Sequence, residues 1–314
     1  MDYRFIDLHT DTLFRMMDEK RLNSFSENTP MHIDLEKIKK GKPLALTLAM
    51  FTEDKKEQST RTLHLNQMLS EFFNIINSNK EIVQALTIND IFQANENEKY
   101  SVILGIEGSG GLQSHKDLYW LHRLGLRIIS PVWNDSNLFA SGNDFPNDGL
   151  TNEGRKLIKT AKELGIVIDI SHLNYKGFFE LVDIMENTPF IATHSNSYRL
   201  CSTPRNLKDE QIKAIKASGG IIGITFYNDI LEKGKKAGID DVIRHIDYIV
   251  DKAGIDHVGI GTDFDGIERP LTEISDISMM QRLFERLKDK GYKDKEIKKI
   301  ACENALRVFS EIWI

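Results

Sequence analysis

The chain has 314 residues and a formal net charge of −6 at pH 7, with 40% hydrophobic and 28% charged residues. This composition is ordinary for a soluble globular protein, and an acidic chain without a stripe of lysine and arginine argues against a nucleic-acid-binding surface. No apolar run approaches the roughly 18 residues of a membrane span. The N-terminus has no basic segment followed by an apolar stretch, and Cys201 and Cys302 are too few for a disulfide framework. We therefore expect a reduced, cytoplasmic protein of enzyme size with no membrane partner.

Short apolar runs recur along the chain, and helical patterns fill the gaps between them. Near-continuous apolar runs of this length are typical of parallel strands that are buried on both faces. The runs cover residues 4–10, 44–51, 101–107, 127–133, 166–172, 190–194, 220–227 and 258–264.

The segments between these runs show the apolar spacing of amphipathic helices. Residues 157–164 have this spacing, and Gly165 follows as a residue that ends the helix. Residues 280–287 repeat the pattern before Gly291, and the stretch 294–312 is also amphipathic. The alternation of strand and helix predicts a single (β/α)8 (TIM) barrel domain over residues 1–314. A doubly wound open sheet is the alternative, although no G-x-G-x-x-G motif opens any of the helices.

Chemistry in such a barrel is carried by side chains at the carboxyl ends of the strands. Three histidines and three carboxylates occupy these ends: His9, Asp11, Glu107, His172, His194 and Asp263. Because side chains alternate along a strand, His9 and Asp11 are expected to face the same way as Phe5 and Asp7. The pair is therefore expected to converge with the other four groups in the mouth of the barrel.

Imidazole and carboxylate together suit Zn²⁺ or a similar divalent ion. Six groups exceed the needs of one tetrahedral ion and predict two ions bridged by one carboxylate. Glu107, in the glycine-rich GIEGSGG, is the natural bridge. The remaining histidines are expected to be surface or packing residues, and Asp7 and Asp169 to make buried structural hydrogen bonds. Those histidines are His32, His64, His115, His122, His245 and His257.

The motifs HTD, GIEGSGGL, IDISH, ATHSNSYRLCSTPRN and GIGTDFDG occur in this order along the chain. Together they resemble the renal (membrane) dipeptidase family, peptidase family M19 of the amidohydrolase superfamily, over residues 4–312. Most relatives in that superfamily begin with HxH and often bridge their metals with a carbamylated lysine. HxD with a glutamate on the third strand favours the dipeptidase branch.

The resemblance implies a role for each of these residues in a zinc-dependent dipeptidase. His9 and Asp11 would bind one zinc ion, His172 and His194 the other, and Glu107 would bridge them. A hydroxide between the two ions would attack the peptide bond of a free dipeptide, with Asp263 as the acid/base. Arg205, in STPRN, matches the arginine that holds the C-terminal carboxylate of the substrate, a task that suits a planar guanidinium. The family also implies tolerance of a C-terminal D-residue and a homodimer.

One departure from the family concerns the fourth strand. Renal-type members carry a histidine shortly after it, whereas this chain reads ISPVWNDSNLF there. Trp133, Asn134 or the loop 135–150 is expected to shape this side of the pocket. Two other functions stay open on the sequence: another amidohydrolase, such as a cyclic-amide hydrolase, lactonase or deaminase, and a non-catalytic barrel with a binding role.

Overall fold

A computed structural model of the chain describes residues 2–17, 25 and 29–313. Its centre is a parallel sheet of eight strands in the order β6-β5-β4-β2-β1-β8-β7, with β3 paired to β4 beside this path. The strands are β1 Ile6–Thr10, β2 Ala45–Phe51, β3 Ile82–Gln84, β4 Tyr100–Glu107, β5 Leu126–Ile129, β6 Val167–Ile168, β7 Ile222–Ile224 and β8 Val258–Ile260.

The sheet is curled, and one short segment lies between its two end strands. Ile191 forms an isolated parallel bridge with Asp169, just after β6, and Ala192 forms one with Ile222 of β7. The predicted run 190–194 therefore lies in its expected place but is not a regular strand. The other seven predicted runs each overlap a strand, and β3, which pairs with β4 beside the main path, is a strand that the sequence did not predict.

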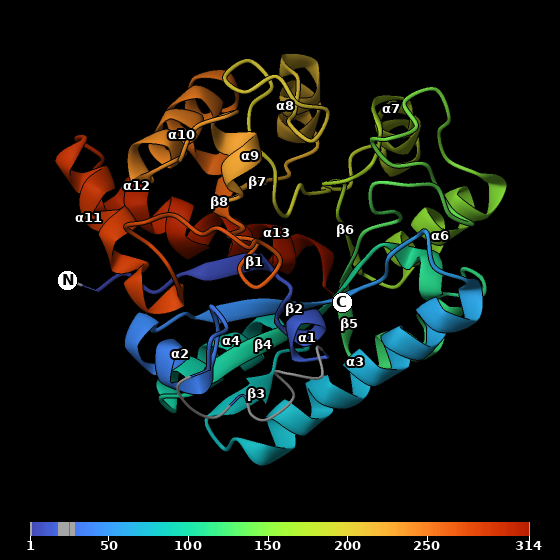
Figure 1. Cartoon of the computed structure of the whole chain (residues 1–314), viewed down its shortest axis with the longest axis horizontal. Coiled ribbons are helices and arrows are strands. Elements are labelled where there is room, and N and C mark those ends of the chain that lie inside the picture. Colours follow the sequence, from blue (N-terminus) through green and yellow to red (C-terminus); the bar gives the residue numbers. More distant parts are fainter. Residues whose placement is uncertain (1, 18–24, 26–28, 314) are drawn as a thin grey trace.

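Helices surround the outside of this curled sheet (Figure 1). They are α1 Thr12–Met16, α2 Leu35–Gly41, α3 Gln58–Ser78, α4 Ile88–Glu96, α5 Asp117–Arg123, α6 Asn152–Glu163, α7 Tyr175–Met185, α8 Asp209–Ala217, α9 Asn228–Leu231, α10 Ile239–Ala253, α11 Gln281–Asp289, α12 Asp294–Lys298 and α13 Asn304–Ile312.

Local sequence signals explain where the predicted helices begin and end. The Thr151 side chain accepts a hydrogen bond from the Gly154 amide at the start of α6, which satisfies one of the free amides of the first turn. Gly165 and Gly291 follow α6 and α11 with φ of 69° and 97°, a region in which residues with a Cβ are strained. The predicted C-terminal helix is α12 and α13, joined by a π-helical turn over Lys299–Glu303.

Two hydrophobic clusters determine which end of the sheet is open. The larger cluster packs between the sheet and the outer helices. The smaller one lies within the curl, where Ile6, Ile103 and Ile191 pack with Phe309 and Ile312 of α13. Because α13 closes the side on which the strands begin, the carboxyl ends of the strands are left for a functional site.

Neither cysteine is in a disulfide, since Cys201 is buried and free and Cys302 is half-buried and free. Across residues 2–17, 25 and 29–313, no helix combines the length and the apolarity that crossing a bilayer requires.

Candidate active site

The N-terminal strand delivers His9 and Asp11 to the open end of the sheet through an irregularity. Asp7 pairs with Leu46, but Thr10 pairs with Leu48, so β1 has one more residue than β2 over this interval. Bulges of this kind reorient the side chains that follow them. The expected regular alternation from Phe5 to Asp11 is therefore wrong, since Phe5 packs in the outer cluster.

Glu107 is the last residue of β4 and is placed by a close approach of two chain segments. It pairs with Phe51, the last residue of β2, and its side chain is almost fully buried. The next residue, Gly108, has φ of 77°, and a Cβ there would lie 3.0 Å from the Thr52 carbonyl oxygen. The glycine at position 108 therefore allows the two backbone segments to approach closely beside Glu107.

A buried aspartate fixes the backbone that carries His172 and His194. The Asp169 carboxylate accepts hydrogen bonds from the backbone amides of Ser171 at 3.0 Å and Thr193 at 2.8 Å. It also accepts from both hydroxyl groups, at 2.6 and 2.8 Å. One carboxylate thus ties together the two segments that precede His172 and His194, and the predicted structural role of Asp169 is confirmed.

Asp7 makes a similar link between β1 and the segment after β8. Its carboxylate accepts hydrogen bonds from the Thr262 amide at 2.9 Å and from the Thr262 hydroxyl at 2.6 Å. Asp263 follows with φ of 66°, a conformation that costs an ordinary residue energy and often occurs at functional sites. A Cβ on Gly266 would lie 2.1 Å from Asp11 Oδ2 and 2.6 Å from Asp263 Oδ1. Gly266 therefore lets the chain pass directly beside both carboxylates.

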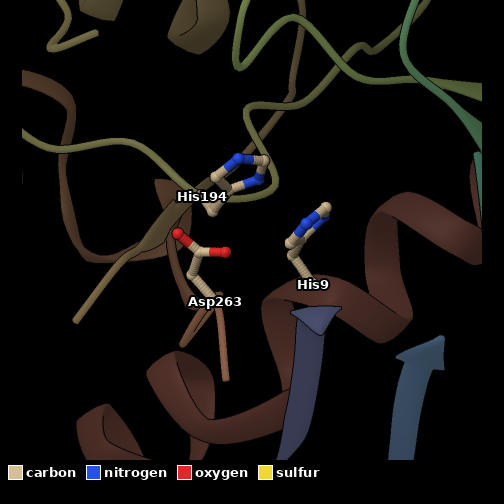
Figure 2. Close-up of side chains that lie close together, drawn as sticks. All are labelled: His9, His194 and Asp263. Atoms are coloured by element: carbon tan, nitrogen blue, oxygen red, sulfur yellow. The ribbon is translucent and has the colours of Figure 1, made fainter. Parts of the chain in front are cut away.

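These elements bring the six predicted strand-end groups into one cluster. Glu107 Oε1 lies 2.7 Å from His172 Nε2 and 3.2 Å from His194 Nε2. Its other oxygen, Oε2, lies 3.5 Å from His9 Nε2, which is 3.6 Å from Asp11 Oδ2. Figure 2 shows His9, His194 and Asp263 lying together, and their ligand-type atoms are all within 4.8 Å of one another.

Hydrogen bonds on the outer side of two imidazoles determine where their protons lie. His172 Nδ1 is 2.7 Å from Asn134 Oδ1, an acceptor, so Nδ1 carries the proton. His194 Nδ1 is 2.8 Å from the Thr193 hydroxyl, which donates its own proton to Asp169. Both rings therefore present an unprotonated Nε2 to the cluster, an arrangement typical of histidines that bind a metal through Nε2.

The charge state of these groups favours a bound cation. Burial and the nearby Arg205 charge lower the pKa of His172 to about 4, and burial and the His9 charge hold that of His194 well below its usual range. Two neutral nitrogens 2.9 Å apart therefore face the same carboxylate oxygen without a proton between them. His9 Nε2 and Asp11 Oδ1 are also buried without a hydrogen-bond partner. The donor set thus fits divalent metal ions such as zinc.

The carboxylates differ in their affinity for protons. Burial disfavours the ionised form of Glu107, but the positive charge of the neighbouring His9 opposes it, and the pKa of Glu107 lies well below its usual range. Burial and the neighbouring Asp11 carboxylate raise the pKa of Asp263 well above its usual range. Asp263 is consequently the carboxyl group in the cluster that is best suited to accept and keep a proton.

Arg205 lies beside the cluster and is oriented by backbone. Its guanidinium donates hydrogen bonds to the carbonyl oxygens of Ser171 and His194, the second at 3.3 Å. Both carbonyls belong to the segments that present His172 and His194. The structure therefore places Arg205, which the sequence alone did not distinguish from a surface residue, at the wall of the same cavity.

The cavity has a volume of about 460 Å³ and opens above the cluster. Trp133 and Asn134 line it, as expected, whereas no residue of the loop 135–150 is among its lining residues. Asn143 of this loop acts from behind the wall, where its side-chain amide donates to the His172 carbonyl oxygen at 3.1 Å. Sequence reasoning missed several lining residues, because their segments carry no motif. They are Phe14, Arg15, Phe51, Glu53, Tyr227, Asn228, Asp229, Glu268 and Arg269.

The other histidines with described contacts have structural partners. His245 is fully buried in α10, where its Nδ1 accepts from the Ser197 amide and its Nε2 lies 3.0 Å from the Leu231 carbonyl oxygen. His32 Nδ1 accepts from the Asp265 amide at 2.8 Å, and His115 pairs with Glu153. These three contacts agree with the expected packing roles.

Comparison with known proteins identifies relatives of the whole chain. Residues 1–313 match the family model described as membrane dipeptidase (peptidase family M19). An uncharacterised protein from the pqqA 5′ region of Klebsiella pneumoniae is 38% identical, over 73% of this chain and 88% of its own length. The dipeptidase tcpJ of Claviceps purpurea is 25% identical, over 90% of this chain and 69% of its own length.

Among solved structures, this chain is similar to a metallopeptidase from Rhodobacter sphaeroides that is liganded with a phosphinate mimic of the dipeptide L-Ala-D-Ala. The two share 25% sequence identity and a TM-score of 0.93, and the match covers 100% of each chain. The likeness therefore includes the curled sheet and the helices around it.

Proposed function

The chain belongs to the membrane dipeptidase family, peptidase family M19, and on that premise we propose that it hydrolyses free dipeptides with the help of two zinc ions. Glu107 gives the strongest support, because one of its oxygens lies near His172 and His194 and the other near His9. A carboxylate placed in this way suits two neighbouring ions.

In this proposal, each ion has its own pair of protein ligands. His9 and Asp11 hold one, His172 and His194 hold the other, and Glu107 is shared. When bound, the ions would lower the pKa of a water between them and polarise the substrate carbonyl.

The remaining steps belong to residues of this chain. Asp263 accepts a proton from the attacking water and delivers it to the nitrogen of the leaving amine, a role that its raised pKa supports. Arg205 holds the C-terminal carboxylate through charge-assisted hydrogen bonds. Two of its N–H groups already bind backbone, which restricts the guanidinium to one orientation.

The substrates proposed here include dipeptides with a C-terminal D-residue. The ligand of the Rhodobacter sphaeroides metallopeptidase, a mimic of L-Ala-D-Ala, supports this choice. The nearest activity class is that of membrane dipeptidases, EC 3.4.13.19.

We further propose that residues 1–314 form one (β/α)8 barrel domain, in which the segment 190–194 is the strand between β6 and β7. The isolated bridges of Ile191 and Ala192 support this closure. A cytoplasmic location and a homodimer stay predictions from the sequence and the family.

Replacement of Glu107 by Ala tests the shared ligand. We expect the unmodified protein to hold close to two zinc ions per chain, Glu107→Ala to weaken both sites, and His9→Ala to empty mainly one. Metal content is measured by plasma mass spectrometry after gel filtration, and hydrolysis of L-Ala-D-Ala is followed on the same samples.

Glu268→Ala is the matched control, because it removes an exposed carboxylate at the cavity mouth, outside the metal cluster. It should leave the metal content unchanged. Two ions retained by both Glu107→Ala and His9→Ala would remove Glu107 from the bridging role.

A further inference from the structure

We propose that Phe14, Phe51 and Trp133 form an aromatic wall that receives the side chain of the N-terminal residue of the dipeptide. The enzyme would accordingly prefer dipeptides that begin with a large apolar residue. This inference rests on the proposed dipeptidase function and specifies its substrates.

The three rings form a continuous surface from the cavity mouth to the metal cluster. All three residues line the cavity. The ring centroids of Phe14 and Phe51 are 4.9 Å apart, and those of Phe51 and Trp133 are 5.1 Å apart, both in edge-on geometry. Trp133 in turn lies 5.9 Å from the His172 ring. An apolar group beside the reacting centre would thus contact aromatic carbon along the whole wall.

The inner part of the wall is fixed before any substrate arrives. The Trp133 amide donates to Asp54 Oδ2 at 3.1 Å, and Asp54 is a buried carboxylate that also pairs with Arg61 at 3.6 Å. Phe51 is the last residue of β2 and is paired in register with Glu107. Rigid aromatic groups lose little conformational entropy on binding, so their contact area contributes efficiently to affinity.

The polar side chains around the wall already have partners. Arg15 Nε donates to the Asp265 carbonyl oxygen at 2.9 Å, and Glu53 lies 3.5 Å from Lys56 Nζ. The Asn134 side-chain oxygen is occupied by His172 Nδ1. Phe14, by contrast, leaves 40% of its surface exposed at the mouth. An apolar side chain would cover this surface, which is favourable in water.

The position of Arg205 determines which residue of the dipeptide meets the wall. Arg205 follows the segment 190–194, which bridges to both ends of the sheet. Phe51 ends β2, the middle strand of the sheet order, so Phe51, with Phe14 packed against it, lies across the curl from Arg205. With the C-terminal carboxylate at Arg205 and the scissile bond at the cluster, the N-terminal side chain extends toward the wall.

A substrate series with a constant C-terminal residue tests the wall. For the zinc-loaded protein we expect kcat/KM for Phe-Ala to exceed that for Gly-Ala by about 10-fold or more, as for apolar groups in other enzyme pockets. Phe14→Ala and Phe51→Ala should each reduce this ratio several-fold while Gly-Ala is still cleaved. Phe51→Leu, which keeps an apolar side chain, should restore part of the preference.

Phe92→Ala is the matched control, since Phe92 is an exposed aromatic residue of α4 that does not line the cavity. It should leave the ratio unchanged. The proposed wall is overturned if the ratio of kcat/KM for Phe-Ala to that for Gly-Ala is near one in the unmodified protein, or if neither Phe14→Ala nor Phe51→Ala changes it. Either result would leave the proposed dipeptidase function standing. If the protein hydrolyses no dipeptide, the proposed function is overturned. The aromatic wall is then tested by calorimetric binding of Phe-Ala and Gly-Ala to the Asp263→Asn variant. Equal affinities for the two dipeptides would exclude the wall.

Discussion

Asp263→Asn should lower the turnover of a dipeptide by roughly 10²- to 10⁴-fold, the usual contribution of a positioned acid or base. The amide preserves the size of the side chain and much of its hydrogen bonding, but it cannot carry a proton from the attacking water to the leaving nitrogen. Steady-state kinetics on L-Ala-D-Ala, with the metal content measured on the same preparation, provides the test.

The metal measurement is needed because Asp263 lies within 4.8 Å of ligand-type atoms of His9 and His194. Metal content close to that of the unmodified protein, together with slow turnover, identifies proton transfer as its main role. A loss of one ion in Asp263→Asn would make it a ligand instead, and near-normal turnover would show that another group moves the proton. Glu268→Gln, at the mouth of the cavity, serves as the carboxylate control and should keep its turnover.

Arg205→Ala should lower kcat/KM for free dipeptides by about 10- to 150-fold, while C-terminal dipeptide amides should be affected little. Loss of a charge-assisted hydrogen bond typically costs ~1.5–3 kcal/mol, which corresponds to that range of rates. The amide substrate has no carboxylate to lose, so the comparison works as a double-mutant cycle. Arg205→Lys should recover only part of the rate, because an ammonium group cannot reproduce the planar fork.

The amide substrates also control for an indirect effect. Arg205 donates hydrogen bonds to the carbonyl oxygens of Ser171 and His194. An indirect effect of Arg205→Ala would therefore be a displacement of His172 and His194. A general disturbance of the metal cluster would slow dipeptides and amides equally and would lower the metal content. Equal rates for amides and free dipeptides in the unmodified protein would contradict the carboxylate clamp and favour a cyclic-amide or ester substrate.

The sequence predicted which side chains lie together, because each of them stands at or next to the end of a buried run. Glu107 and His9 follow apolar residues that can be assigned to strands without a structure, and the carboxyl ends of parallel strands meet at one edge. The run 190–194 illustrates a limit. Its segment is placed as predicted, but it is held by isolated bridges and by Asp169 rather than by a regular ladder.

Other features depend on contacts between distant segments and have no local signal. The extra residue in β1 is visible only from its pairing with β2. Asn134 orients the His172 imidazole from another segment, and Gly266 matters only because Asp11 and Asp263 pack against it. Polar and small residues of these types are common in loops, so neither composition nor spacing distinguishes them there.

Dipeptide hydrolysis by the metal-stripped protein, titrated with Zn²⁺, tests the central claim most directly. The stripped protein should show no hydrolysis of L-Ala-D-Ala above background, and activity should rise to a plateau near two equivalents of zinc per chain. A lactone and a cyclic amide measured at that plateau should react far more slowly than the dipeptide. Full dipeptide hydrolysis without metal, or a loaded protein that cleaves the lactone or the cyclic amide but no dipeptide, would contradict a metal-dependent dipeptidase.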